Sequence, residues 1–304
     1  MSTKTQTLKT NRGIRTHYIL SDNESQIETW FRLLLRAACF FKGKVHSVVP
    51  SGKNSLATAI NRAQPGEILE IGPGTYSENI IISKCLQLRA KDPHNPPVIQ
   101  PDDIDKPTIV IQNCQGVSFQ ELIIDGGNES TSKHVFTDVA LIDMDNATLF
   151  VHNCEIMQSY GYGVKVTNGS TFGMHGGQIH RCTGVGVYAL SKGVNPLRSQ
   201  VTLEQTAVFK NGKDGVQVLS GGSLFVRWAK IHSNQRSGIC ISTSDSAHVS
   251  FCELFDNMID GLTVESIPSD IQIYSNHIHD NKGLSIMVVP KVADTSAFLI
   301  DNVE

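Results

Sequence analysis

His152 and His175 hold the same position in successive copies of a repeat, and they are the first candidates for chemistry in this chain. If the copies stack, the two imidazoles would lie roughly 5 Å apart, close enough to share one metal ion. The matching positions of later copies hold Arg227 and Ser250, and no third ligand is evident. We therefore interpret the two rings as a stacked surface or corner pair and not as a metal site.

A second pair, His277 and His279, flanks Ile278, so both rings of an extended segment would point to the same side. No carboxylate partner for them is apparent in the following copy of the repeat. We assign this pair no role, and the sequence predicts neither a bound metal nor another cofactor.

Glycosidic bond cleavage usually requires several carboxylates held close together, which in a stacked repeat would recur from copy to copy. Asp143 and Asp145 align with Val166 and Asn168 in the next copy. Glu155 aligns with residues of mixed type, namely Gln178, Ala207, Lys230 and Glu253. No acidic column persists, so the sequence predicts no catalytic residue and favours a protein that is not an enzyme.

The clearest polar column consists of four asparagines, spaced 23, 23 and 24 residues apart: Asn211, Asn234, Asn257 and Asn281. Asparagines stacked at a bend can hydrogen-bond to one another and satisfy backbone groups that the bend leaves open. We predict that these four residues form a structural ladder.

The elements that position these side chains are short apolar phrases that each begin with glycine. The glycines are 23, 29, 23, 23 and 22 residues apart, at Gly163, Gly186, Gly215, Gly238, Gly261 and Gly283. Each copy holds two or three short β-branched stretches separated by turn-forming residues, which leaves no room for a long helix. The period predicts a parallel β-helix, in which every copy is one rung packed on its neighbours.

The stretch 66–90 contains Pro-Gly-Thr-Tyr-Ser-Glu between an Ile-x-Ile and a Leu-x-Leu segment. It resembles the opening turn of the pectin-lyase-like superfamily, and with the rung from Asn276 the resemblance spans roughly residues 45–290. The resemblance implies an all-β fold, a right-handed parallel β-helix solenoid over residues 55–290. It does not imply one activity, because this fold hosts enzymes and scaffolds alike. The signature motifs of polygalacturonases and pectin methylesterases are absent.

Ser55 begins a short helix that Pro65 and Gly66 end, and we expect this helix to cap the open end of the solenoid. Residues 42–54 are predicted to be a linker and residues 291–304 a C-terminal tail.

Residues 1–41 form a separate N-terminal segment, in which a strand over Gly13–Leu20 is followed by an amphipathic helix. Residues 13–38 resemble the C-terminal end of a pleckstrin-homology domain, without the earlier strands that carry lipid binding in that family. Trp30 and Phe31 lie on the apolar face of this helix and are candidates for contact with a partner.

Two polar stretches interrupt the period, residues 125–137 and 191–200. Insertions in a solenoid become loops on its flank, where binding surfaces are common. These loops supply the remaining partner-binding candidates, which are Asn128, Lys133, His134, Lys192, Asn195 and Arg198.

Charge and cysteine content limit the location and the partners. With 26 basic and 29 acidic residues the net charge is −3, which gives no reason to expect binding to nucleic acid. No signal segment or membrane span is evident, and the seven cysteines lack paired or metal-binding spacing. We predict reduced cysteines that fill space between rungs. We also predict a cytoplasmic protein, with association with the cytoskeleton as an option.

The style of the rungs is similar to that of the β-helix regions of the Shc-binding/Nessun dorma family and of β-helix F-box proteins. That resemblance, with the missing acidic column, favours a non-enzymatic scaffold that presents a rigid β-helix to protein partners in a cytoskeletal or cell-division assembly. The alternative is a carbohydrate-binding or carbohydrate-active protein of the lyase or epimerase kind. Exposed aromatic rings would favour the alternative, and the clustered candidates are Tyr160, Tyr162, Tyr188 and Trp228.

Overall fold

The computed structural model describes residues 3–10, 13–20, 44–48, 54–127, 137–191, 198–242, 246–268, 270–289 and 299–303, which belong to two units, Met1–Lys42 and Gly43–Glu304. In the first unit, β1 (Thr3–Thr10) pairs antiparallel with β2 (Gly13–Leu20). The predicted strand over Gly13–Leu20 is confirmed, whereas β1 was not predicted from the sequence. The predicted helix, with Trp30 and Phe31, lies outside the described residues.

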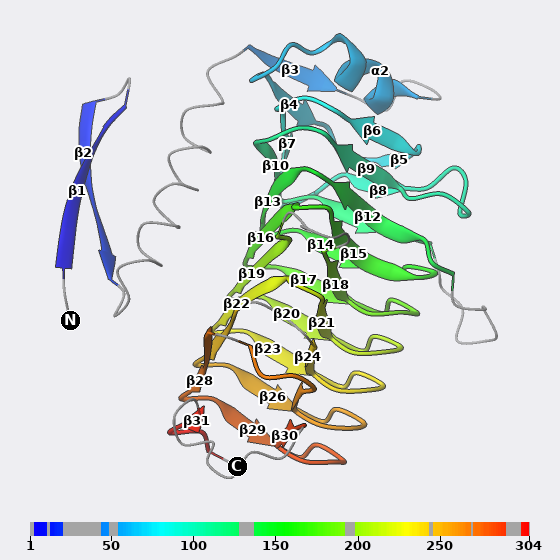
Figure 1. Ribbon diagram of the computed structural model, residues 1–304. Coiled ribbons are helices and arrows are strands. Elements are labelled where there is room, and N and C mark those ends of the chain that lie inside the picture. The colour runs from blue at the N-terminus through cyan, green and yellow to red at the C-terminus, as the bar shows by residue number, and fades with distance from the viewer. Residues whose placement is uncertain are drawn as a thin grey trace. The chain divides into compact units, whose positions relative to one another are not determined.

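Three parallel sheets build the second unit, and their strands follow one another around each rung (Figure 1). The first sheet has 11 strands in the order β3-β4-β7-β10-β13-β16-β19-β22-β25-β28-β31. Their bounds are β3 Val45–Val48, β4 Ile68–Ile71, β7 Gln87–Ala90, β10 Val117–Gln120, β13 Thr148–His152, β16 Thr171–His175, β19 Gln200–Glu204, β22 Ser223–Arg227, β25 Ser246–Ser250, β28 Asp270–Tyr274 and β31 Leu299–Ile300.

The second and third sheets have nine strands each. The second sheet consists of β5 Thr75–Ser77, β8 Val98–Gln100, β11 Ile123–Asp125, β14 Glu155–Met157, β17 Gln178–His180, β20 Ala207–Phe209, β23 Lys230–His232, β26 Glu253–Phe255 and β29 His277–His279. The third sheet consists of β6 Ile80–Ile82, β9 Ile109–Gln112, β12 Ala140–Asp145, β15 Tyr162–Thr167, β18 Val187–Leu190, β21 Val216–Leu219, β24 Ile239–Ser242, β27 Leu262–Val264 and β30 Ile286–Val288.

Alternation of buried and exposed side chains gives each strand one face toward the interior of the solenoid. In β19, for example, Val201 and Leu203 are buried, whereas Thr202 and Glu204 face outward. Buried aliphatic side chains from all three sheets form one continuous core along the axis. Each rung buries its apolar face only when its neighbours are stacked in register, as the repeat predicts. The predicted right-handed parallel β-helix solenoid is confirmed.

Helix α2 (Ser55–Arg62) covers the first rung, and its Leu56 and Ile60 are buried in the core. The carboxylate of Glu78 accepts hydrogen bonds from the backbone N–H groups of Leu56 at 2.9 Å and Ala57 at 2.7 Å. Glu78 thereby satisfies two donors at the helix N-terminus. This contact gives a structural reason for the glutamate of the Pro-Gly-Thr-Tyr-Ser-Glu corner.

The predicted asparagine ladder is confirmed. The side-chain Nδ2 of Asn211 donates to Oδ1 of Asn234 at 3.0 Å. In the same way, Nδ2 of Asn234 donates to Oδ1 of Asn257 at 3.0 Å, and Nδ2 of Asn257 donates to Oδ1 of Asn281 at 2.9 Å. Backbone N–H groups donate to the same oxygens, for example from Asn211 to Asn234 at 3.1 Å. A shorter ladder of the same kind joins Asn276 to Asn302 at 2.9 Å.

The solenoid extends beyond the predicted range of residues 55–290. Strand β3 lies within the predicted linker 42–54 and pairs with β4, while β31 lies within the predicted tail 291–304 and pairs with β28. Both strands continue the first sheet by backbone hydrogen bonding, which requires no copy of the glycine phrase. Among the described helical residues, none belongs to a segment with the length and apolarity needed to cross a membrane.

The cysteines in the described part of the chain are free thiols: Cys85, Cys114, Cys154, Cys182, Cys240 and Cys252. Burial raises the pKa of Cys154 and of Cys182 to about 12. Thiols of this kind are poor nucleophiles and behave as small apolar side chains. The interpretation of these cysteines as packing residues is confirmed.

Candidate functional site

Four outward-facing residues of the first sheet form a row along the solenoid, which we call the polar row: His152, His175, Glu204 and Arg227. They are register partners at the last positions of β13, β16, β19 and β22. Each follows a buried aliphatic residue, so the pleat turns these side chains away from the core.

The two histidines of the polar row stack as predicted. Their ring centroids are 5.4 Å apart and the planes are inclined by 20°. The amide of Asn153 lies 3.3 Å from Nε2 of His152 and holds that ring at the corner. The Nδ1 atom of His175 is shielded from solvent and has no hydrogen-bond partner within the described part of the chain. His175 therefore offers a ring nitrogen that no protein group among those residues occupies.

Glu204 and Arg227 continue the row with opposite charges. Burial raises the pKa of Glu204, and the nearby charges of His175 and Arg227 oppose that rise. The guanidinium of Arg227 lies 3.9 Å from the ring centroid of Trp228, and its Nε is buried without a hydrogen-bond partner among the residues described. Arg227 thus stacks on an aromatic ring and keeps donor capacity for another molecule.

Aromatic side chains border this end of the polar row. Trp228 and Phe251 are 44% and 42% exposed, although rings of this size are usually more deeply buried. Their centroids are 6.4 Å apart, and Phe251 makes an edge contact with Tyr274 at 5.5 Å. Of the predicted aromatic candidates, Tyr162 is instead buried and stacks on Tyr188 at 4.7 Å. Trp228 has the exposure that favours sugar binding.

A hollow of about 500 Å³ lies at the corner between the first and second sheets, where Asn153 follows His152. Polar groups in its wall are supplied by His94, Glu121, Asn153, Glu155 and Gln178. The corner has no side chain at Gly176 and Gly177, whose φ angles are +68° and +74°. A Cβ at Gly177 would collide with the backbone oxygen of Cys154, so glycine is required there, whereas at Gly176 the nearest atom belongs to the side chain of Asn153.

Five rings form a second column on the outer face of the second sheet: His180, Phe209, His232, Phe255 and His279. Successive centroids are 4.7, 5.0, 4.5 and 5.3 Å apart, and the planes are nearly parallel. Burial lowers the pKa of His180 and of His232, which favours their neutral forms. This ring column escaped the sequence analysis because histidine and phenylalanine alternate in it.

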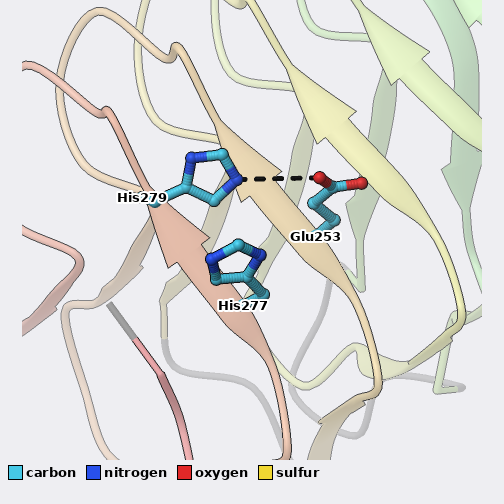
Figure 2. Close-up of side chains that lie close together, drawn as sticks. All are labelled: Glu253, His277 and His279. Carbon is cyan, nitrogen blue, oxygen red and sulfur yellow. Dashed lines mark ion pairs between the residues drawn. The ribbon is translucent and has the colours of Figure 1, made fainter.

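His277 and His279 have a carboxylate neighbour in the preceding rung, where the sequence analysis did not look. Glu253 is the register partner of His277, and its Oε1 lies 3.6 Å from Nε2 of His279 (Figure 2). The carboxylate comes from the preceding rung, whereas the sequence comparison considered only the following one. The alignment of Glu155 with Glu253, extended by one more copy, would have led to His277.

Of the predicted partner-binding residues, the structure describes Arg198 alone. Arg198, which precedes β19, is exposed. The others lie outside the described residues: Asn128, Lys133, His134, Lys192 and Asn195, with Trp30 and Phe31 of the N-terminal segment.

Solved structures similar to this chain include three carbohydrate-active proteins. An alginate lyase from Paenibacillus sp. aligns with a TM-score of 0.51 and 12% identity, covering 86% of this chain and 99% of the lyase. The pectate lyase Pel9A aligns with a TM-score of 0.49 and 14% identity, covering 84% of this chain and 79% of the lyase. The A-module of the mannuronan C-5 epimerase AlgE4 of Azotobacter vinelandii aligns with a TM-score of 0.48 and 13% identity, covering 82% of this chain and 88% of the module. At a sequence identity this low, the structural similarity shows a shared fold alone.

These comparisons overturn the predicted function. The expectation of a non-enzymatic scaffold with protein partners is contradicted by the structural similarity to an alginate lyase. The sequence analysis sought a column of acidic residues, whereas the polar row combines imidazole, carboxyl and guanidinium groups.

A known protein family also matches the chain. The family described as a right-handed beta helix region matches residues 102–227 and 178–298, which together exceed half of the 304 residues. No curated protein matches the chain. The three parallel sheets and the stacked asparagines agree with the family match. The chain therefore belongs to the right-handed β-helix family.

Proposed function

We propose that this protein binds an acidic polysaccharide along the outer face of the first sheet and cleaves it by β-elimination. The observation that carries the proposal is the pair of buried, unpartnered nitrogens in the described polar row, Nδ1 of His175 and Nε of Arg227, on either side of Glu204. A row of polar groups at regular rung spacing suits a linear polymer with a regular repeat.

Recognition of the sugar acid is assigned to Arg227 and Trp228. A guanidinium binds a carboxylate through two parallel hydrogen bonds, and the exposed face of an indole packs on the apolar face of a pyranose ring. The 3.9 Å stacking contact of Arg227 on Trp228 fixes the guanidinium and reduces the entropy lost when a ligand binds.

The elimination needs a base and an acid. We assign the base to His175, whose neutral ring can accept the proton from C5 of the uronate. The electron pair of that C–H bond forms the C4–C5 double bond, and the bond from C4 to the glycosidic oxygen breaks. Glu204 donates a proton to the leaving oxygen, because burial raises its pKa and favours the protonated acid. Arg227 stabilises the negative charge that develops on the uronate carboxylate.

Assays with alginate and polygalacturonate test the proposal, and a neutral glucan serves as the control substrate. The C4–C5 double bond of the product absorbs in the ultraviolet, so turnover is followed directly. His175→Asn and Glu204→Gln should each lower kcat by about a hundredfold or more, since proton-transfer groups contribute about 10²–10⁴. Arg227→Lys should mainly raise KM, because a lysine cannot form the paired hydrogen bonds.

The matched control is His232→Phe, which changes a histidine of the ring column on a different sheet and keeps a ring in the stack. This variant should retain wild-type turnover. Binding of acidic polysaccharide without an unsaturated product would contradict the elimination step. Unchanged turnover in His175→Asn would contradict the assigned base.

A further inference from the structure

Three side chains near the C-terminal end of the second sheet converge on one point. Glu253 begins β26, while His277 and His279 occupy the two ends of β29. Ile278 between the histidines is buried in the core, so both imidazoles project from the outer face toward the carboxylate (Figure 2). The three side chains come from two adjacent rungs and are separate from the polar row.

The spacing of the three groups suits ligands of one metal ion. One ligand atom from each residue lies within 4.8 Å of the other two. Nε2 of His279 is 3.6 Å from Oε1 of Glu253, which is too long for a hydrogen bond. Two ligand atoms about 2.0–2.1 Å from a tetrahedral zinc ion are themselves about 3.3 Å apart. A small movement of either side chain would bring both atoms to bonding distance.

The orientation of His279 provides a second, independent observation. Its Nδ1 lies 2.7 Å from Oδ2 of Asp280, and Nε2 is shielded from solvent without a hydrogen-bond partner in the described chain. An imidazole that donates Nδ1–H to a carboxylate presents the lone pair of Nε2 to its other side. Carboxylate–histidine–metal arrangements have this geometry.

Lys230 determines which oxygen of Glu253 is available. Its ammonium lies 2.9 Å from Oε2, which leaves Oε1 as the oxygen that faces His279. Two imidazole nitrogens and one carboxylate oxygen suit borderline divalent ions such as Zn²⁺ or Co²⁺. Ca²⁺ and Mg²⁺ prefer oxygen ligands throughout.

We propose that Glu253, His277 and His279 bind one divalent transition-metal ion, with remaining coordination positions open to water or another ligand. Three protein ligands with an open position are typical of zinc sites that bind or activate a further group. His277 is exposed, so an ion can enter from solvent. The proposal does not depend on the polar row or on polysaccharide cleavage.

The test uses the full chain without a polyhistidine tag, stripped of metal by a chelator. Titration with Co²⁺ should produce visible absorption bands that saturate at one equivalent, and added Zn²⁺ should displace them. His279→Phe keeps a ring beside Phe255 in the ring column while removing the ligand nitrogen. It should weaken Co²⁺ binding at least about tenfold, as should Glu253→Gln.

His232→Phe is the matched control, because it makes the same exchange in the same column and removes none of the three ligands. It should bind Co²⁺ as the wild type does. Circular dichroism establishes that each variant is folded, and Glu253→Gln decides the question if His279→Phe does not fold. The proposal is overturned if the wild type shows no saturable absorption, or if a folded ligand variant binds Co²⁺ as tightly as the wild type.

Discussion

Replacement of Asn234 by leucine is the most informative perturbation of the solenoid. The side chain is fully buried, and leucine has a similar volume but cannot hydrogen-bond. Asn234 donates from Nδ2 to Oδ1 of Asn257 at 3.0 Å and to the carbonyl oxygen of Val208 at 3.3 Å. Its Oδ1 accepts from the backbone and side-chain nitrogens of Asn211, at 3.1 and 3.0 Å. The substitution removes all four bonds.

The expected loss of stability follows from those four bonds. A typical buried hydrogen bond contributes about 1 kcal/mol, so their removal costs about 4 kcal/mol. The N–H groups of Asn211 would be buried without an acceptor, which increases the loss of stability, while burial of the leucine side chain partly offsets it. We expect the free energy of unfolding to fall by about 3–5 kcal/mol.

Urea unfolding followed by circular dichroism measures this loss. Gln235→Ala changes the exposed neighbouring side chain and should alter stability by less than about 0.5 kcal/mol. Hydrogen exchange should also accelerate at the backbone amide of Asn211, which loses its acceptor. A loss below about 1 kcal/mol in Asn234→Leu would refute the claim that the ladder stabilises the rungs.

Two further changes test other contacts of the solenoid. Burial lowers the pKa of His180 below the value near 6.5 that a histidine has in the unfolded chain. As the pH falls, the unfolded chain therefore binds a proton before the folded protein does. The free energy of unfolding should decline between about pH 7.5 and pH 5.5. In His180→Phe this decline, measured by urea unfolding at both pH values, should be smaller, and an unchanged pH dependence would argue against the cause assigned here. Glu78→Ala removes the two hydrogen bonds to the N-terminus of α2 and should lower the free energy of unfolding by about 1–2 kcal/mol. An equal melting temperature for this variant and the wild type would contradict the capping role.

The fold could be predicted because each rung repeats the same physical requirement. Gly215 and Gly238 recur at the rung period because a Cβ on either would collide with the next rung and with a ladder asparagine. The asparagines recur because each accepts the backbone N–H of the one before. Identical residues in a column make such constraints visible in a single sequence.

The site was harder to predict because its columns mix residue types. Glu204 follows His175 by 29 residues, and the insertion between them obscured its alignment with the polar row. His180 and Phe209 stack although the imidazole can carry a charge and the phenyl ring cannot. Glu253 was missed as a neighbour of His277 because it lies in the preceding rung and only the following rung was compared. In these columns the position is constant while the chemistry changes from rung to rung.

The most direct test of the proposed function is a crystal structure of the His175→Asn variant with an acidic oligosaccharide. We predict a uronate carboxylate within hydrogen-bond distance of Arg227, a sugar ring packed on Trp228, and C5 facing position 175. An oligosaccharide on the second or third sheet, or no bound sugar at saturating concentration, would contradict the account.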